Sequence, residues 1–271
     1  MAILFCRAGR SARRPIASVA VIALLAIGTA ALAENSEIAR RRAIEQKIFT
    51  DAQIAEGFFK VTFGAEFAAA GRVDRIRKFA APIRIFIDNR ALPDRQKQVL
   101  ATLDDIRRRI KNLDIAVTAQ RNDANMIVTL VRDRDLPHTI RSVFGTDRAR
   151  RIQRSLEPQC LSSFAKDDSY RIVHANVILV ADAGEFVFYD CAYEELLQAL
   201  GPINDDSSVP WTMFNDNVQL GFFGVYDQYL LNILYHPRVL PGMTRDEVRA
   251  LLPEVLPDVR GWVAELNHLP N

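Results

Sequence analysis

Histidine and cysteine are scarce in this sequence. Its 271 residues include three cysteines and four dispersed histidines: His138, His174, His236 and His268. Zinc-protease helices place histidines at short fixed intervals, and the sequence contains no such pair. The chain also has no Gly-x-Ser-x-Gly turn, no phosphate-binding loop and no Gly-x-Gly-x-x-Gly run. Serine-hydrolase, phosphate-loop and dinucleotide-binding chemistry therefore lack their usual sequence marks.

An excess of positive charge is missing beyond the first 33 residues. Those residues hold four arginines and no acidic residue, so the remainder has 31 basic and 33 acidic residues. The formal net charge of +2 for the whole chain becomes −2 for this remainder. Nucleic-acid-binding domains normally carry a basic excess. We therefore expect no nucleic-acid partner.

Residues 1–33 have the layout of an export signal. A basic start with Arg7, Arg10, Arg13 and Arg14 precedes the uncharged run IASVAVIALLAIGTAALA, which ends in the small residues of a cleavage site. We expect removal of this segment and export to the periplasm or secretion. A single membrane anchor is the alternative, because the run is near the lower length limit for spanning a bilayer. Membrane contact is then expected only through the uncleaved signal.

Two cysteines remain beyond this segment, Cys160 and Cys191. An even pair in an exported chain predicts a disulfide. Closing a loop of this length would stabilise the fold by roughly 3 to 4 kcal/mol. A metal-binding or redox-active pair is the alternative, although the Cys-x-x-Cys spacing is absent.

The hydrophobic pattern predicts several strands. Alternating or continuous apolar runs indicate strands over residues 82–88, 113–119, 125–131 and 171–182, and a short one over EFVFYD after Gly184. Apolar residues at helical spacing lie between and around them. The fold class is therefore α+β, with a mixed twisted sheet and packed helices in one globular domain.

Helices are expected over residues 37–70, 138–155 and 191–204, and over the C-terminal tail, where Thr244 and Glu247 can form a capping box. Another helix should begin at Pro93. Its buried stripe would be Leu100, Leu103, Ile106 and Ile110. The triplet Arg40-Arg41-Arg42 fits a solvated helix face better than a contact with a membrane or an acidic polymer.

The stretch CAYEELLQALGPIN, residues 191–204, has a suggestive spacing. Helical residues i and i+4 share a face. Zinc proteases place two histidines there, with a catalytic Glu after the first, and add a turn Gly and a third ligand. In this register the ligand positions hold Glu194, Gln198 and Asn204, and the catalytic position holds Glu195. Met213, in WTMF, stands where a Met-turn would lie.

Three separated motifs resemble one family. CAYEELLQALGPIND, TMFND and LLNILYHPRVLPGM resemble, in this order, an uncharacterised domain-of-unknown-function family of exported, proteobacterial-type proteins. The helix of that family reads Glu-Glu-x-x-Gln-x-Leu-Gly-x-x-Asn-Asp, and the likeness runs from EGFFKVTFGAEF, near residue 56, to about residue 243. The same helix is similar to that of matrixin-like zincins. The resemblance implies a zincin-like fold, with residues 226–234 as the helix after the Met-turn, and it implies no activity.

The ligand positions depart from the zincin pattern. Zinc sites on such a helix need imidazoles, whereas Gln198 and Asn204 offer only amide oxygens. We therefore expect no metal and no cofactor. A zinc site rebuilt from distant histidines is one alternative, and a calcium loop of Asn204, Asp205 and Asp206 with Asp216 is another, although turns use the same residues.

Residues 191–204 also fit an ordinary amphipathic helix that ends at Gly201. The resemblance favours a retained binding face, and hence a non-catalytic binding protein of the cell envelope. Its partner would be a peptide or another envelope component. The expected parts are a signal peptide (1–33), a helical lead (34–55), a zincin-like domain (56–243) and a helical tail (244–271).

Two other functions stay open. One is a structural envelope protein. The other is a hydrolase that uses Glu195 as a general base without zinc. Neighbouring Glu194 and Glu195 diverge on a helix, so a glycosidase would need a second carboxylate from elsewhere in the chain.

Overall fold

A computed structural model describes residues 35–64, 74–155 and 159–270. The chain divides into two units, Met1–Ala33 and Glu34–Asn271, and every described helix and strand belongs to the second unit. The expected signal segment lies outside the described residues. In the described part of the chain, no helix has the length and apolar character needed to cross a membrane.

The strands form one six-stranded mixed sheet, which confirms the predicted fold class. The order is β1-β6-β4-β2-β3, and β5 pairs with β6 outside this path. The β5–β6 pair is antiparallel and the other pairs are parallel. The strands are β1 (Lys78–Phe79), β2 (Ile83–Asn89), β3 (Ile115–Val117), β4 (Met126–Val131), β5 (Cys160–Lys166) and β6 (Arg171–Val180). Every residue of the central strand β4 is buried, as its continuous apolar sequence predicts.

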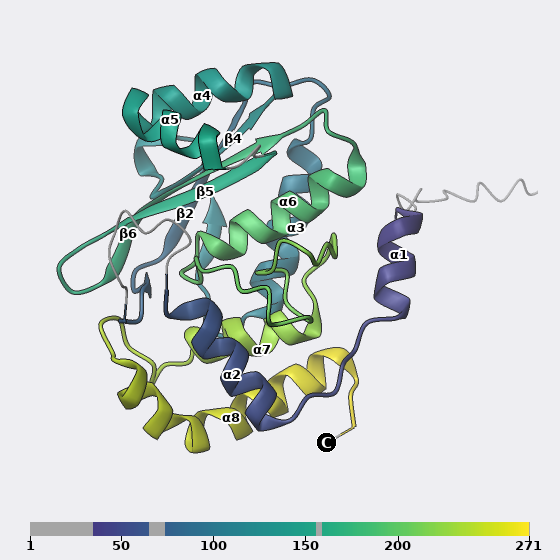
Figure 1. The fold of residues 1–271 in the computed structure, drawn as a ribbon, viewed down its shortest axis with the longest axis vertical. Coiled ribbons are helices and arrows are strands. Elements are labelled where there is room, and N and C mark those ends of the chain that lie inside the picture. The colour runs from purple at the N-terminus through teal and green to yellow at the C-terminus, as the bar shows by residue number, and fades with distance from the viewer. Residues whose placement is uncertain (1–34, 65–73, 156–158, 271) are drawn as a thin grey trace, which may run out of the picture. The chain divides into compact units, whose positions relative to one another are not determined.

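Helices cover both faces of the sheet (Figure 1). One face carries α4 (Leu136–Phe144) and α5 (Thr146–Ser155), and α3, α6 and α7 lie on the other side, with α2 and α8 beyond them. The remaining bounds are α1 (Ser36–Ala43), α2 (Asp51–Thr62), α3 (Gln96–Arg109), α6 (Glu185–Gln198), α7 (Val225–Leu234) and α8 (Arg245–Asn267).

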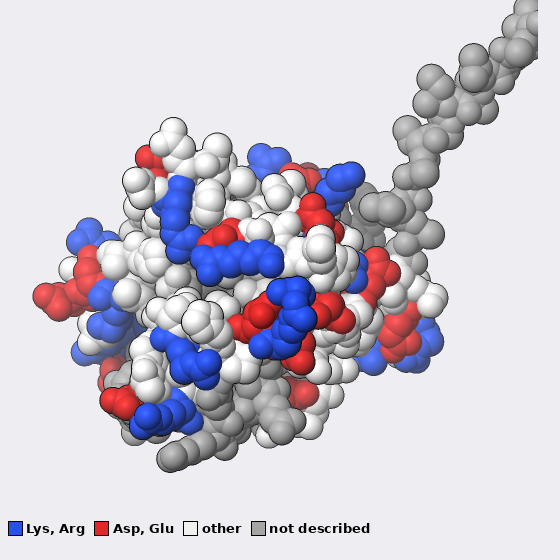
Figure 2. Space-filling model, turned by 90° about the horizontal axis from the view of Figure 1, so that it is seen from above, with Lys and Arg blue, Asp and Glu red and all other residues white. Residues whose placement is uncertain are grey.

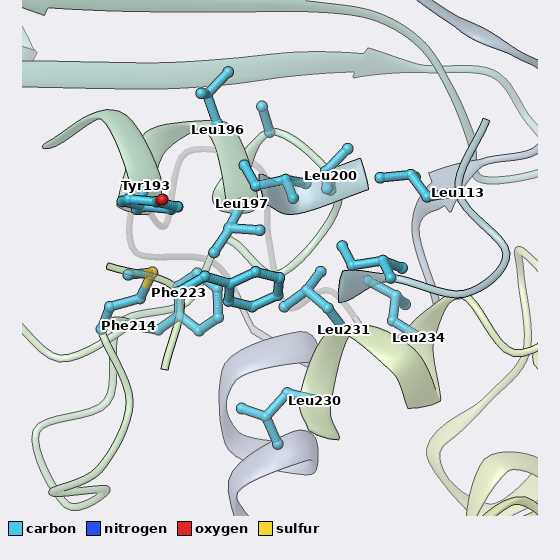
Figure 3. Close-up of a cluster of buried hydrophobic side chains, with 14 of the residues drawn as sticks. Leu113, Tyr193, Leu196, Leu197, Leu200, Phe214, Phe223, Leu230, Leu231 and Leu234 are labelled. Atoms are coloured by element: carbon cyan, nitrogen blue, oxygen red, sulfur yellow. The ribbon is translucent and has the colours of Figure 1, made fainter. Parts of the chain in front are cut away.

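The two faces of the sheet have separate apolar cores. A small core under α4 and α5 includes Leu136, Ile140 and Ile178. The large core on the other face joins the sheet to α6, α7 and α8. Figure 3 shows its centre, where Leu197 of α6 and Leu231 of α7 lie close to Phe223. Residues from α1, α2 and α8 belong to this same core.

Several helix predictions need correction. EFVFYD is not a strand but the first half of α6, because Gly184 caps the helix and Phe188 is fully buried in the core. Helix α3 begins at Gln96 rather than Pro93, and Leu100 is 39% exposed, so Val99 takes its place in the buried stripe.

The two long predicted helices are interrupted. Residues 44–50 separate α1 from α2, and residues 65–73, which include the end of the predicted 37–70 helix, lie outside the described residues. Gly145, with a positive φ of 77°, divides 138–155 into α4 and α5. The capping box of Thr244 and Glu247 at the start of α8 is confirmed.

The arginine triplet does not form a simple solvated face. The Arg41 guanidinium lies over the Phe186 ring and that of Arg42 over the Phe222 ring, at 4.7 and 4.3 Å from the ring centres. Ile38 of the same helix is buried. Helix α1 is therefore packed on α6 and on the loop that precedes α7.

Candidate functional site

The helix α6 is fixed beneath the strand β5 at two points. Cys191 forms a disulfide with Cys160, with the two Cα atoms 5.8 Å apart, which confirms the predicted bridge. Two turns further along, the Ser162 hydroxyl donates to Oε1 of Gln198 at 3.2 Å. Residues 191, 194 and 198 lie on one side of a helix. Glu194 therefore lies between the two attachment points, on the side of α6 that faces β5.

Three carboxylates meet on this side of α6, and we call them the acidic cluster: Glu194, Asp205 and Asp216. Each has an oxygen within 4.8 Å of the others. The Gln198 amide donates to both oxygens of Asp205, at 3.1 and 3.3 Å. Glu194 and Asp205 are partly buried and Asp216 is exposed. The structure thus supplies the neighbouring carboxylates that the sequence could not place beside Glu194.

Burial raises the pKa of Glu194 far above the usual value for a glutamate. The charges of Glu195, Asp205, Asp190 and Asp216 raise it further. No hydrogen bond or ion pair from the described residues offsets this effect at Glu194. A protonated carboxyl, or a cation brought by a partner, would relieve the repulsion in the cluster.

Two predicted ligand positions are occupied by protein contacts. Gln198 is 5% exposed and bonds Ser162 and Asp205. The Asn204 side-chain amide donates to the Lys60 carbonyl at 2.9 Å. Both amide groups therefore hold the protein together.

The other positions that match the zinc-protease helix pattern are mostly buried. Glu195 is 7% exposed and Met213 is 2% exposed. Gly201 has a φ of +141°, and a Cβ there would lie 2.3 Å from the Arg77 carbonyl oxygen. The turn after α6 therefore requires glycine at this position.

Zinc does not fit the predicted positions. None of them carries an imidazole, and the two amides are already hydrogen-bonded within the protein. Among the described residues, the one group that could hold a metal ion is the acidic cluster, which contains no histidine. Its oxygens are of the type that Ca²⁺ or Mg²⁺ prefers, but Ca²⁺ takes roughly six to eight ligands, and the cluster supplies three side chains. Asp206 accepts from Ser208, as in an ordinary turn.

A second set of buried carboxylates was not predicted from the sequence. Glu45, Asp190 and Asp227 each accept backbone N–H groups from residues 212–225, the region between α6 and the start of α7. Asp227 is fully buried and also accepts from the Thr212 hydroxyl, and burial raises its pKa to about 7. Burial also raises the pKa values of Asp190 and Glu45. Acidic residues in otherwise apolar helices, as in VYDQYLLNIL, are the one sequence signal for such roles.

Surface charge does not separate into large regions of one sign on the face seen from the α4–α5 side. Figure 2 shows lysine and arginine side chains interspersed with aspartate and glutamate there. This arrangement is in line with the nearly balanced charge of the sequence.

Comparison with known proteins places the chain in a family. Residues 51–254 match the family described as protein of unknown function (DUF2927). No curated protein matches the sequence. The matched region begins with α2 and extends into α8, so it includes the whole sheet, α6 and the acidic cluster. The chain therefore belongs to the DUF2927 family of proteins of unknown function.

Proposed function

We propose that this chain is an exported, zincin-like binding protein of the cell envelope that performs no zinc chemistry. The partner is a peptide segment that lies along β5 and above α6. The export signal expected from residues 1–33 supports the location, and the helix register with a buried Met213 supports the zincin relation.

The arrangement of α6 carries this proposal. The ligand positions of a zincin helix remain polar, but Gln198 and Asn204 are bound to the protein and Glu194 faces other carboxylates. The side that faces β5 thus keeps a group of carboxyl side chains and lacks the donors that hold zinc. A partner that brings positive charge would be favoured there.

The strand β5 offers backbone groups to such a partner. Leu161 and Ser163 pair with Ile178 and Asn176 of β6. The alternation of an antiparallel ladder then turns the backbone N–H and C=O of Ser162 away from β6. An extended peptide can add to a strand edge of this kind.

Metal analysis tests the first half of the proposal. The mature protein, purified from the periplasm without chelators, should contain far less than one zinc per chain. Added zinc should leave the Tm unchanged. One tightly held zinc per chain would overturn the proposal. The protein would then be a candidate zinc protease whose histidine ligands come from distant positions in the sequence.

Peptide binding tests the second half. The probe is a short extended peptide of alternating threonine and valine with a central lysine, and its matched control has glutamate at the centre. Fluorescence anisotropy should show at least about tenfold tighter binding of the lysine peptide, since one ion pair in a partly buried site is worth roughly 1 to 2 kcal/mol.

Glu194→Gln with Asp216→Asn should remove this preference. Asp147→Asn with Asp246→Asn, two exposed carboxylates on α5 and α8, is the matched control and should retain it. Equal affinity for both peptides, or none for either, contradicts the proposed partner.

A hydrolase is the second candidate, and the burial of Glu195 favours it. A general base needs a partly desolvated carboxylate, and Glu195 is 7% exposed beside Glu194, whose pKa is raised. Peptide and peptidoglycan substrates should be incubated with the metal-free protein. Turnover that Glu195→Gln abolishes while the fold is retained would replace the binding hypothesis with the enzyme hypothesis.

A further inference from the structure

The segment between α1 and α2 presents apolar side chains to solvent. We call residues 44–50 the strap; they form neither helix nor strand and run along one side of the second unit (Figure 1). Ile44 is 74% exposed and Ile48 is 69% exposed. Among the large apolar side chains described, Leu92 is the one other residue with comparable exposure. Single exposed apolar residues are ordinary, so the question is why two share one short segment.

Two neighbours fix which side of the strap faces outward. The Glu45 carboxylate accepts the backbone N–H of Val225 at the start of α7. The Phe49 ring is 3% exposed and packs against Tyr226 and Trp211, with ring centres 4.7 and 5.6 Å away. With Glu45 and Phe49 held inward, Ile44 and Ile48 cannot turn into the core. Their exposure is therefore built into the packing of the strap.

Basic side chains accompany the two isoleucines. Residues 36–48 contain three arginines and one lysine against two glutamates. Lys47, within the strap, is exposed, and Arg40, on the preceding helix, is exposed but forms an ion pair with Glu37. Glu45 is turned inward, so the outward side of the strap combines two apolar side chains with the charge of Lys47. Peripheral membrane segments have this composition.

We propose that the strap docks the domain on a bilayer surface that contains anionic lipids, with Ile44 and Ile48 inserted at the interface. One feature favours a bilayer over a protein partner. The positive charge of Lys47, next to the two exposed isoleucines, is complementary to anionic headgroups. This contact does not depend on the peptide site, which is formed by α6 and β5.

Vesicle co-sedimentation of the mature protein, residues 34–271, tests the proposal. The probes are vesicles of phosphatidylethanolamine with phosphatidylglycerol, and vesicles of phosphatidylcholine alone. The protein should partition onto the anionic vesicles at low salt and not onto the neutral ones. Ile44→Ser with Ile48→Ser should lower the partition coefficient about tenfold, because two partly inserted isoleucines leave the interface.

The matched control is Leu92→Ser, which removes an equally exposed leucine before α3 and should leave partitioning unchanged. Lys47→Gln should lower it about fivefold at low salt. The serine variants should keep the wild-type Tm, because the replaced side chains are exposed.

Three results would overturn the proposal. The first is that the protein fails to bind anionic vesicles, and the second is that the double serine variant binds them as well as the wild type does. The third is that sedimentation velocity detects a dimer of the wild type and a monomer of the double serine variant. The last result would identify a second copy of the chain as the occupant of the strap.

Discussion

Two carboxylates on α6, Asp190 and Glu194, are one helical turn apart and have opposite surroundings. Asp190 accepts the backbone N–H groups of Leu220 and Gly221, at 2.7 and 2.9 Å. Glu194 has other carboxylates as its neighbours and no hydrogen-bond donor among the described residues. Both side chains lose hydration on folding. Asp190 regains part of that loss by holding the loop, whereas Glu194 does not, which is typical of a group retained for binding.

The largest expected effect comes from removing the bridge next to Asp190. Cys160→Ala with Cys191→Ala should lower the free energy of unfolding by roughly 3 to 4 kcal/mol, because a cross-link across 31 residues restricts the unfolded chain. Urea titration of the mature protein measures this loss. A change below about 1 kcal/mol would mean that the bridge adds little to the attachment of α6.

The matched pair Asp190→Ala and Glu194→Ala tests the comparison directly. Asp190→Ala should cost about 2 kcal/mol, because two buried backbone N–H groups lose their acceptor. Glu194→Ala should be stabilising at pH 7, since it removes a carboxyl group whose ionisation is disfavoured by burial and by the neighbouring carboxylates. Chemical denaturation at pH 7 measures both values. Equal losses would show that Glu194 has a structural role like that of Asp190.

The pH dependence of stability should separate Glu194→Gln from the wild type. The pKa of Glu194 is raised in the folded protein above its unfolded value of 4.5, so the stabilising contribution is complete below that pH. It is lost as the pH rises toward the folded pKa. The wild type should therefore lose up to about 1.4 kcal/mol per pH unit relative to Glu194→Gln from about pH 4.5 through neutrality. Denaturation curves that stay parallel between pH 4.5 and pH 7.5 would contradict the raised pKa.

The smallest effect is expected at Arg41, which contacts the same loop as Asp190. Its guanidinium donates to the Gln219 carbonyl and lies over the Phe186 ring. Arg41→Ala should cost about 1 kcal/mol, whereas Arg41→Lys should retain part of the ring contact. Thermal unfolding at matched pH measures both. If neither variant changes the Tm, the carboxylates of Glu45, Asp190 and Asp227 hold the loop without a contribution from Arg41.

The sequence predicted most of the sheet and much of α6 correctly. The strands β2, β4 and β6 have strong period-2 or continuous apolar patterns. In the structure these three segments are strands, and β4 pairs with both β2 and β6. The strand β5, CLSSFAK, was missed because serines and a lysine interrupt its apolar residues. EFVFYD was assigned to a strand because local β propensity favours aromatic residues, whereas packing against the core makes it helical.

The candidate site was only partly predictable. The polar positions of α6 followed from helical spacing, and the disulfide followed from the cysteine count. The contacts of Glu194 with Asp205 and Asp216 depend on how the loop after α6 folds back. No local pattern encodes that path, because backbone N–H groups of the loop donate hydrogen bonds to Glu45, Asp190 and Asp227, which are distant in the sequence or lie on other elements.

The bridge between Cys160 and Cys191 also has a consequence for when the site is complete. In a reducing compartment both residues remain thiols, and β5 and α6 are then held together by packing and by the hydrogen bond between Ser162 and Gln198. Oxidation adds the covalent link between the strand and the helix. A chain delivered to an oxidising compartment would therefore gain this covalent link after arrival, and the proposed binding surface would be complete only there.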